Sequence, residues 1–450
     1  MSTSRPAGGN GVLFRRIAEV ARSGRLDRDP EWHSLLALWQ ADRLDESRRQ
    51  RLISKLRHLE VQEAFGRHPP FRKPQLQKKG ILIGFDLDGD DQNLSFDFAV
   101  EGALFVGNSG SGKSSFLLLV SRSLAASGRK VWVSDLAKRE ARHWLPIFRE
   151  VGSDLVVLRA SDLKYNLLQA TGDPHRHLAM AVDLLDRGLG LPPRSRAVIR
   201  GKCYEQYARF GIFDGQTEAW PTLFDVFEAI RVDHEMNFAS RDALLGRLTP
   251  FLTALTPACG AYRYGWQSND LAKWSIVFEM AGASEQVKHI VLESLLFSLF
   301  AHAVEQGTLN STLRLAVAFE DGMRFFDAGH QPGSEIMPME EAPGVVRSTG
   351  LGLIPIVQTT VGMSRRLLPN LATKVMFRLG SHDDYQRVGK DLGMDSEQRK
   401  WASLNLEPGL ALVQASQGSW RHPALIRVPL VEHPASVDEA GVLASQRALD

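Results

Sequence analysis

A glycine-rich segment in the first third of the chain carries the residues with the clearest chemistry. Gly107-Asn108-Ser109-Gly110-Ser111-Gly112-Lys113-Ser114 matches the pattern G-x-x-x-x-G-K-[ST]. Its glycines let successive backbone N–H groups point at phosphate oxygens, beside the positive end of a helix. Lys113 would reach the β- and γ-phosphates, and the Ser114 hydroxyl would ligate Mg²⁺. The sequence therefore predicts that residues Gly107 to Ser115 bind a nucleoside triphosphate, with ATP and Mg²⁺ as cofactors.

A second apolar run ends in two carboxylates. Residues 313–319 read as a strand and are followed by Glu320-Asp321. A strand of this kind normally ends Asp-Glu, where Asp holds the water shell of the metal and Glu orients the attacking water. Here the order is exchanged, so Glu320 would hold the metal together with Ser114, and Asp321 would act on the water. Solvated acids at a strand end are the alternative, and Glu279 is a rival carboxylate.

The pattern around these segments predicts an α/β fold. Short β-rich apolar runs alternate with helical segments from residue 102 on, which is typical of a largely parallel sheet with helices on both faces. Expected strands lie at 104–106, 131–134, 155–158, 276–279, 313–319, 353–357, 374–379 and 410–413, after a hairpin of 81–85 with 94–98. Between residues 173 and 271 the periodicity becomes helical, which predicts an α-helical insertion.

We expect five parts along the chain. A small helical, basic N-terminal region would cover residues 1–75, and the α/β domain would be made of 76–172 and 272–431, on either side of the insertion. Residues 432–450 are expected to form a loosely held helix or tail.

Composition excludes several classes of protein. The chain has 450 residues, 44% of them hydrophobic, and 54 Lys and Arg against 52 Asp and Glu, so wholesale disorder, collagen and coiled coil are excluded. Two cysteines, Cys203 and Cys259, are too few for a disulfide scaffold. The N-terminus lacks the apolar run of a signal peptide, and the apolar stretch 290–304 is too short to span a bilayer. We therefore expect a cytoplasmic protein with no membrane span.

Charge is concentrated at the N-terminus. Residues 1–80 contain 17 Lys and Arg against 9 Asp and Glu. Such a surplus fits an acidic partner such as nucleic acid, but we favour a solvated helical surface, because runs of charge usually form one.

With these residues in hand, the sequence resembles the HerA–FtsK superfamily of P-loop ATPases from about residue 81 to residue 431. The run from Gly128 to Asp135 is similar to the second strand of that family, which ends in Asp, and Tyr165-Asn166-Leu167-Leu168 is similar to its YNPL segment. The resemblance implies a RecA-like P-loop NTPase domain. It also implies a homo-oligomer, a hexameric ring, with DNA as a partner.

Two further residues take their expected roles from this resemblance. Gln358 ends a strand that resembles the family strand ending in Gln, so it would sense the γ-phosphate; a Gln at the core edge is the alternative. Arg378 lies in a segment that resembles the arginine-bearing strand, and it would complete the site of the neighbouring subunit. Arg387 is the second candidate for that role, and an ordinary surface arginine is the alternative for both.

Three functional hypotheses follow. The first is an ATP-driven ring motor, a DNA translocase or helicase, with Arg347, Arg365 and Arg366 as DNA contacts unless they form a solvated surface. The second is an ATP-gated assembly platform with slow hydrolysis, whose N-terminal region holds a nuclease or another antiphage effector. The exchanged Glu320-Asp321 pair and the missing N-terminal β-barrel favour this second hypothesis. The third is a soluble secretion or conjugation coupling ATPase, which needs a membrane partner.

Overall fold

The computed structural model describes residues 69–73, 80–255, 262–306, 310–320, 344, 348–363, 367–416, 418–431 and 436–449. The chain divides into two units, Met1–Pro70 and Phe71–Asp450. The predicted N-terminal region, 1–75, therefore lies outside the described residues except for 69–73. Everything below concerns the second unit.

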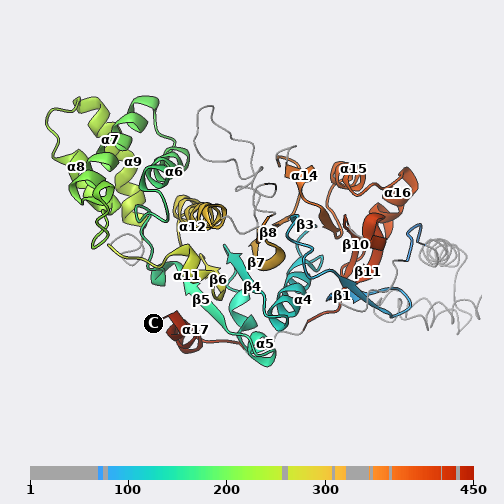
Figure 1. Ribbon diagram of the computed structural model, residues 1–450. Coiled ribbons are helices and arrows are strands. Elements are labelled where there is room, and N and C mark those ends of the chain that lie inside the picture. Colours follow the sequence, from blue (N-terminus) through green and yellow to red (C-terminus); the bar gives the residue numbers. More distant parts are fainter. Residues whose placement is uncertain are drawn as a thin grey trace, which may run out of the picture. The chain divides into compact units, whose positions relative to one another are not determined.

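The second unit contains one large sheet. Its eleven strands follow the order β2-β1-β11-β10-β9-β3-β8-β7-β4-β6-β5 (Figure 1). The strands are β1 (Ile81–Phe85), β2 (Asp91–Leu94), β3 (Ala103–Val106), β4 (Lys130–Asp135), β5 (Leu155–Arg159), β6 (Ser275–Glu279), β7 (Asn310–Glu320), β8 (Thr349–Val357), β9 (Thr373–Met376), β10 (Leu410–Gln414) and β11 (Ala424–Arg427). All neighbours from β9 to β5 are parallel, and those from β2 to β9 are antiparallel. The predicted α/β class with a mostly parallel sheet is confirmed.

Most expected strands are present, and two differences have a physical cause that the structure shows. The hairpin partner of β1 is 91–94 rather than 94–98, because the chain turns after Leu94: Phe98 N donates to Ser95 O at 3.2 Å and Val100 N to Asp97 O at 3.0 Å. Strand β11 was not expected from the sequence. It pairs with β10 and β1, so long-range pairing rather than local pattern forms it.

Helices cover both faces of the sheet and fill the chain between β5 and β6. Around the sheet lie α4 (Lys113–Ala126), α5 (Leu145–Glu150), α12 (Glu285–Glu305), α14 (Leu367–Asn370), α15 (His382–Asp391), α16 (Ser396–Asn405) and α17 (Glu439–Gln446). Between β5 and β6 lie α6 (Pro174–Leu189), α7 (Pro193–Arg209), α8 (Leu223–Arg231), α9 (Phe238–Ala254) and α11 (Ser268–Leu271). Helices α6 to α9 form the green group of Figure 1, where the sequence predicts the insertion. The predicted domain boundaries themselves stay predictions.

The central strand β3 shows how the two faces are built. Leu104 and Val106 belong to one buried cluster, together with residues of α12 and the insertion helices. Ala103 and Phe105 belong to a second cluster, together with residues of α4 and α5. Because successive side chains of a strand point to opposite faces, β3 is buried on both sides, as an inner strand of a parallel sheet requires.

Helix α12 is a core helix by its burial. Among the described helices it is long and apolar enough to cross a membrane by length and composition, with a mean hydropathy of 1.4 in its most apolar window. However, 72% of that window is buried inside the fold. It extends over the apolar stretch 290–304, and it packs against α6 and α11.

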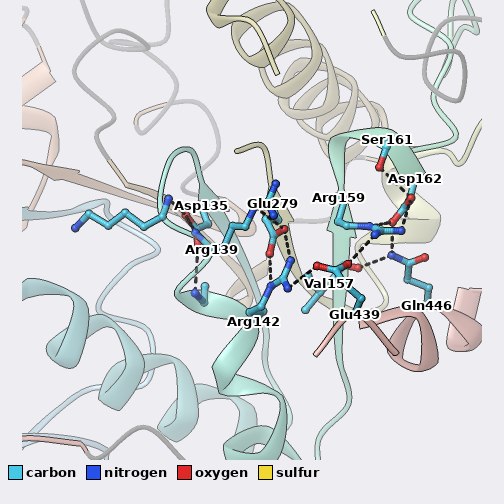
Figure 2. Close-up of polar contacts among 12 residues, drawn as sticks. Asp135, Arg139, Arg142, Val157, Arg159, Ser161, Asp162, Glu279, Glu439 and Gln446 are labelled. Atoms are coloured by element: carbon cyan, nitrogen blue, oxygen red, sulfur yellow. Dashed lines mark hydrogen bonds and ion pairs between the residues drawn. The ribbon is translucent and has the colours of Figure 1, made fainter. Parts of the chain in front are cut away.

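Helix α17 closes one edge of the sheet. Ser445 Oγ accepts a hydrogen bond from Val157 N at 3.1 Å, and Gln446 Nε2 donates to Val157 O at 2.9 Å. These two side chains therefore satisfy backbone groups on the open side of β5, the edge strand (Figure 2). Val442 of the same helix is fully buried. Residues 432–450 were expected to form a loosely held helix or tail. The described part contains the helix α17, and hydrogen bonds and apolar burial together fasten it rather than leaving it loosely held.

Candidate functional site: a phosphate-binding loop at the carboxyl edge of the sheet

The glycine-rich segment forms the turn between β3 and α4. Gly110 and Gly112 have φ values of 72° and 111°, which is the left-handed region that favours glycine. At Gly107 a Cβ atom would lie 2.6 Å from Phe377 Cβ, so only glycine fits beside that residue. The loop can therefore curl tightly and deliver the chain into the first turn of α4, where free backbone N–H groups attract an anion.

Contacts within the loop hold Lys113, the lysine that the sequence predicts to bind phosphate. Ser111 Oγ donates to Asn108 O at 2.7 Å, which closes the turn. Lys113 Nζ donates to Gly107 O and, at 2.7 Å, to Asn108 O. The ammonium group thus lies over the mouth of the loop, where the phosphates of a nucleotide would bind. The loop is also supported from outside, because Gly409 N donates to Ser111 O at 3.1 Å.

The predicted metal ligands meet across the sheet. Glu320 is the last residue of β7, and Ser114 lies in the first turn of α4. Ser114 Oγ donates a hydrogen bond to Glu320 Oε1 at 3.2 Å. A hydroxyl and a carboxylate that converge in this way are the hard oxygen ligands that Mg²⁺ prefers. The residues present therefore fit Mg²⁺, and the described residues contain no group of three or more His, Cys, Asp or Glu that would suit a different metal.

The electrostatic surroundings of Glu320 favour a bound cation. Burial, and after it the negative charge of Asp135, raise the pKa of Glu320 to about 7. The hydrogen bond from Ser114 and the positive charge of Lys138 lower this pKa and offset part of the effect. A nearby cation therefore stabilises the ionised form of this buried carboxyl group more than it would stabilise a solvated carboxylate.

Gln358 lies between the two motifs. Strand β8 separates β3 from β7 in the sheet, with Val106 opposite Val357 and Glu320 opposite Ile356. Gly107 N donates to Val357 O at 3.1 Å, so Gln358 directly follows a residue bonded to the phosphate-binding loop. The exposed Gln358 side chain is thus placed at the edge where a γ-phosphate would lie. Its sensing role stays a prediction.

Arg378 lies beside the phosphate-binding loop of its own chain. It follows β9, the other parallel neighbour of β3, and Asn108 N donates to Arg378 O at 2.8 Å. Its side chain is exposed. Its predicted role in the site of a neighbouring subunit stays a prediction. The second candidate, Arg387 on α15, donates to Met363 O at 3.1 Å.

The structure separates the rival carboxylate from the site. Glu279 is only 2% exposed, and Arg142 binds it with two nitrogens, Nε lying 2.7 Å from Glu279 Oε2 (Figure 2). Arg142 also bonds Glu439 of α17 at 2.8 Å. Both oxygens of Glu279 are therefore engaged in a buried ion pair, and Glu279 serves the packing of the sheet edge.

Asp135 is a residue whose role the sequence alone did not reveal. Its carboxylate accepts backbone hydrogen bonds from Lys138 at 3.0 Å, Arg139 at 3.2 Å and Ala141 at 3.1 Å (Figure 2). It fixes the turn after β4, in which Arg139 has a positive φ of 56°. Strand β4 is the neighbour of β7, so this turn lies next to Glu320.

Four predicted site residues lie outside the described residues: Asp321, Arg347, Arg365 and Arg366. Their expected roles stay predictions. The other predicted residues of the loop, Asn108, Ser109 and Ser115, are described and lie at its mouth or at the start of α4.

The fold and this site together define a RecA-like P-loop NTPase. By sequence, the chain matches no known protein family and no curated protein. Its fold is similar to the folds of several solved structures. VirB4 of Thermoanaerobacter pseudethanolicus is 17% identical with a TM-score of 0.61, covering 80% of this chain and 99% of that one. The bacterial conjugative coupling protein TrwBdeltaN70 is 12% identical with a TM-score of 0.54, covering 79% of this chain and 90% of that one.

A second TrwB structure has the same likeness and contains ligands. Plasmid coupling protein TrwB in complex with ADP and Mg²⁺ is 11% identical with a TM-score of 0.54, covering 82% of this chain and 97% of that one. Similarity at this level of identity establishes the fold. The RecA-like α/β fold that the resemblance implied is therefore confirmed, and membership of the HerA–FtsK superfamily stays a prediction.

Proposed function

We propose that this protein is an ATPase that forms a ring, a hexamer, and moves DNA through it. The observation that carries the ATPase assignment is the hydrogen bond between Ser114 and Glu320, which joins the phosphate-binding loop to the carboxylate strand. The fold shared with TrwB, which has been solved with ADP and Mg²⁺, supports ATP and Mg²⁺ as the cofactors.

The chain's own residues divide the work of phosphoryl transfer to water. The backbone N–H groups of the loop and the Lys113 ammonium hold and neutralise the β- and γ-phosphates. Ser114 and Glu320 would hold Mg²⁺, which would supply positive charge that neutralises the phosphates. Asp321 orients the attacking water, and Gln358 contacts the γ-phosphate. Arg378 or Arg387 adds positive charge where the transition state develops negative charge.

DNA as the substrate of the motor rests on the fold. Neighbours with TM-scores above 0.5 include VirB4 and a conjugative coupling protein. Contacts inside a DNA-threading ring are made mainly to phosphates, so we expect affinity that falls with salt and has little sequence preference. A translocase or helicase working from the cytoplasm is the form of this function that we favour.

A second function remains in consideration because of the exchanged carboxylates. Glu320 reaches Ser114 as a metal ligand should, but the residue that follows it is an aspartate, one methylene shorter than the usual glutamate. Misplacement of a catalytic group by about 1 Å can cost 10²-fold in rate. A slow ATPase would suit an ATP-gated platform that holds a nuclease or antiphage effector. A coupling ATPase for secretion or conjugation is the third form.

The deciding experiment is ATP hydrolysis by the full chain with and without double-stranded DNA. Wild type is compared with Lys113→Ala and Asp321→Ala. The control is Lys130→Ala, because Lys130 begins β4, whereas the site lies at the carboxyl end of the sheet. We expect turnover that rises severalfold with DNA, that disappears in both site variants and that survives in the control.

Each other result has a definite meaning. Turnover that persists in Lys113→Ala would contradict the assignment of the site. ATP binding with little hydrolysis and no response to DNA would contradict the motor and favour the platform.

A further inference from the structure

The two loops that flank the phosphate-binding loop are tied together. Strand β3 has β8 and β9 as its parallel neighbours, so the chain segments that leave β8 and β9 lie on either side of Gly107. Gln358 belongs to the first segment and Arg378 to the second. A group that binds both segments sets the position of Gln358 relative to the phosphates.

Asp384 is such a group. Its carboxylate is 4% exposed and belongs to the first turn of α15. It accepts hydrogen bonds from Thr359 Oγ1 at 2.8 Å and from Thr360 N at 3.1 Å, both directly after Gln358. It also accepts from Ser381 Oγ at 2.9 Å, in the segment after Arg378. A buried carboxylate is costly unless its oxygens are bonded, and here the donors come from both loops.

The segment that carries Asp384 is itself fixed to the phosphate-binding loop. Asn108 N donates to Arg378 O at 2.8 Å, and Leu379 N donates to Tyr385 Oη at 3.0 Å. At Gly380 a Cβ atom would lie 2.8 Å from Asn108 Oδ1, so the missing side chain lets the two loops touch. The contacts thus run from Asn108 through this segment to Asp384, and from there to the residues after Gln358.

We propose that Asp384 is a positioning residue for γ-phosphate recognition, acting through Thr359 and Thr360 on Gln358. This inference rests on the proposed ATPase function and deepens it. Helix capping does not account for the bonds from Thr359 and Thr360 to Asp384. The residue that caps α15 is Ser381, whose hydroxyl accepts from Asp384 N at 3.1 Å. Asp384 holds the segment after β8 from outside the nucleotide site, and it touches no phosphate itself.

The test compares affinity for two ligands that differ by one phosphate. Dissociation constants of MgADP and of a non-hydrolysable ATP analogue with Mg²⁺ are measured for wild type and for Asp384→Asn. The asparagine has the same shape, but only one of its two terminal atoms can accept a hydrogen bond. It cannot keep the bonds that Thr359 and Thr360 donate to Oδ1 together with those that Thr359 and Ser381 donate to Oδ2. We expect affinity for the ATP analogue to fall about tenfold, with the affinity for MgADP within about twofold of wild type. Turnover should fall by a similar factor.

A matched control separates positioning from helix stability. Asp395 is an exposed aspartate that caps α16 and accepts from Gln398 N at 2.8 Å, away from the loops of the site. Asp395→Asn makes the same chemical change and should leave both affinities unaltered. If Asp384→Asn does not fold, Thr359→Val removes one donor while it keeps the shape of the side chain, and it should weaken the ATP analogue in the same direction.

A double-mutant cycle shows whether Asp384 acts through Gln358. If it does, Gln358→Ala with Asp384→Asn should bind the ATP analogue no more weakly than Gln358→Ala alone. Additive losses, or an unchanged preference for the triphosphate in Asp384→Asn, would overturn the inference while leaving the ATPase assignment intact. Failure of wild type to bind either nucleotide would overturn both the inference and the ATPase assignment. Where wild type does bind, loss of binding in Lys113→Ala shows that the binding belongs to this site.

Discussion

Ser114 Oγ donates a hydrogen bond to Glu320 Oε1 at 3.2 Å, although the two residues are 206 positions apart in the chain. The contact brings the end of β7 to the first turn of α4, past the intervening strand β8. Glu320, the first residue of the exchanged pair, therefore faces the phosphate-binding loop. The longer glutamate side chain can therefore occupy the place of the usual aspartate as a metal ligand.

Removing the hydroxyl of Ser114 should remove the benefit of magnesium. In Ser114→Ala we expect Mg²⁺ to tighten ATP binding at least tenfold less than in wild type, since one of two metal ligands from the protein is lost. Binding of ATP without Mg²⁺ should change little. Titration of a fluorescent ATP analogue with and without Mg²⁺ measures both. Ser123→Ala is the control, because the Ser123 hydroxyl bonds Leu119 O within the same helix; an equal effect in that variant would contradict the assignment of Ser114.

Breaking the buried pair between Arg142 and Glu279 should destabilise the fold without being needed for chemistry. Arg142→Ala leaves the buried Glu279 carboxylate with the longer contact to the half-exposed Arg139, at 3.6 Å, in place of its two close bonds, and we expect the free energy of unfolding to fall by about 3 kcal/mol. Arg122→Ala, which breaks an exposed pair with Glu150 at 3.9 Å, should cost less than about 0.5 kcal/mol. Urea unfolding of the three proteins checks this. Similar losses of unfolding free energy in the two variants would show that the buried Arg142 pair contributes no more to stability than an exposed pair.

His177 should make the insertion sensitive to acid. Burial lowers the pKa of His177 to about 4, and its ring nitrogen Nε2 lies 2.9 Å from Leu167 O. The unfolded chain, with an ordinary histidine pKa near 6.5, binds the proton more readily, so stability is complete above that pH and is lost as the pH falls toward 4. Between pH 7 and pH 5 we expect this residue to account for a loss of about 2 kcal/mol.

The measurement is urea unfolding at both pH values, in wild type and in His177→Gln. The glutamine variant is neutral throughout, so its stability should depend less on pH by that amount. An identical pH dependence would mean that His177 is already protonated in the folded protein or exposed to water.

Detaching α17 should expose the edge of the sheet. Val442 of this helix is fully buried, whereas the next residue of the helix, Leu443, is 50% exposed. Val442→Asp places a charge in the contact and should release α17, so that β5 can pair with β5 of another molecule. We expect concentration-dependent assembly larger than wild type in light scattering. Leu443→Asp introduces the same charge into α17 at an exposed position and should behave as wild type. If both variants assemble, the assembly does not depend on the edge of β5.

The parts of this molecule that could be predicted from the sequence are those that local chemistry determines. The phosphate-binding loop is recognisable because its glycines and Lys113 must lie at fixed spacing between a strand and a helix. The inner strands are recognisable because burial on both faces requires continuous apolar runs, as in β8.

The remaining features depend on partners distant in sequence. Glu279 and Glu320 both end apolar strands, and only the position of Arg142 shows that one is engaged in packing and the other faces the loop. Asp384 is one of two adjacent aspartates at the start of a helix, a pattern that predicts nothing more than a favourable helix end. Its bonds to Thr359 and Thr360 exist because β8 and β9 flank β3.

The hydrogen bonds and ion pair between β5 and α17 also affect how the protein folds during synthesis. Synthesis proceeds from the amino end, so Arg159 leaves the ribosome 280 residues before Glu439, its ion-pair partner on α17. Throughout that interval the backbone groups of β5 have no helix beside them, and nascent chains on neighbouring ribosomes can pair through them. A chaperone that holds this strand during translation would fill the place of α17 for that time. The amount of usable protein in a cell would then depend on translation speed and chaperone supply as much as on the stability of the finished fold.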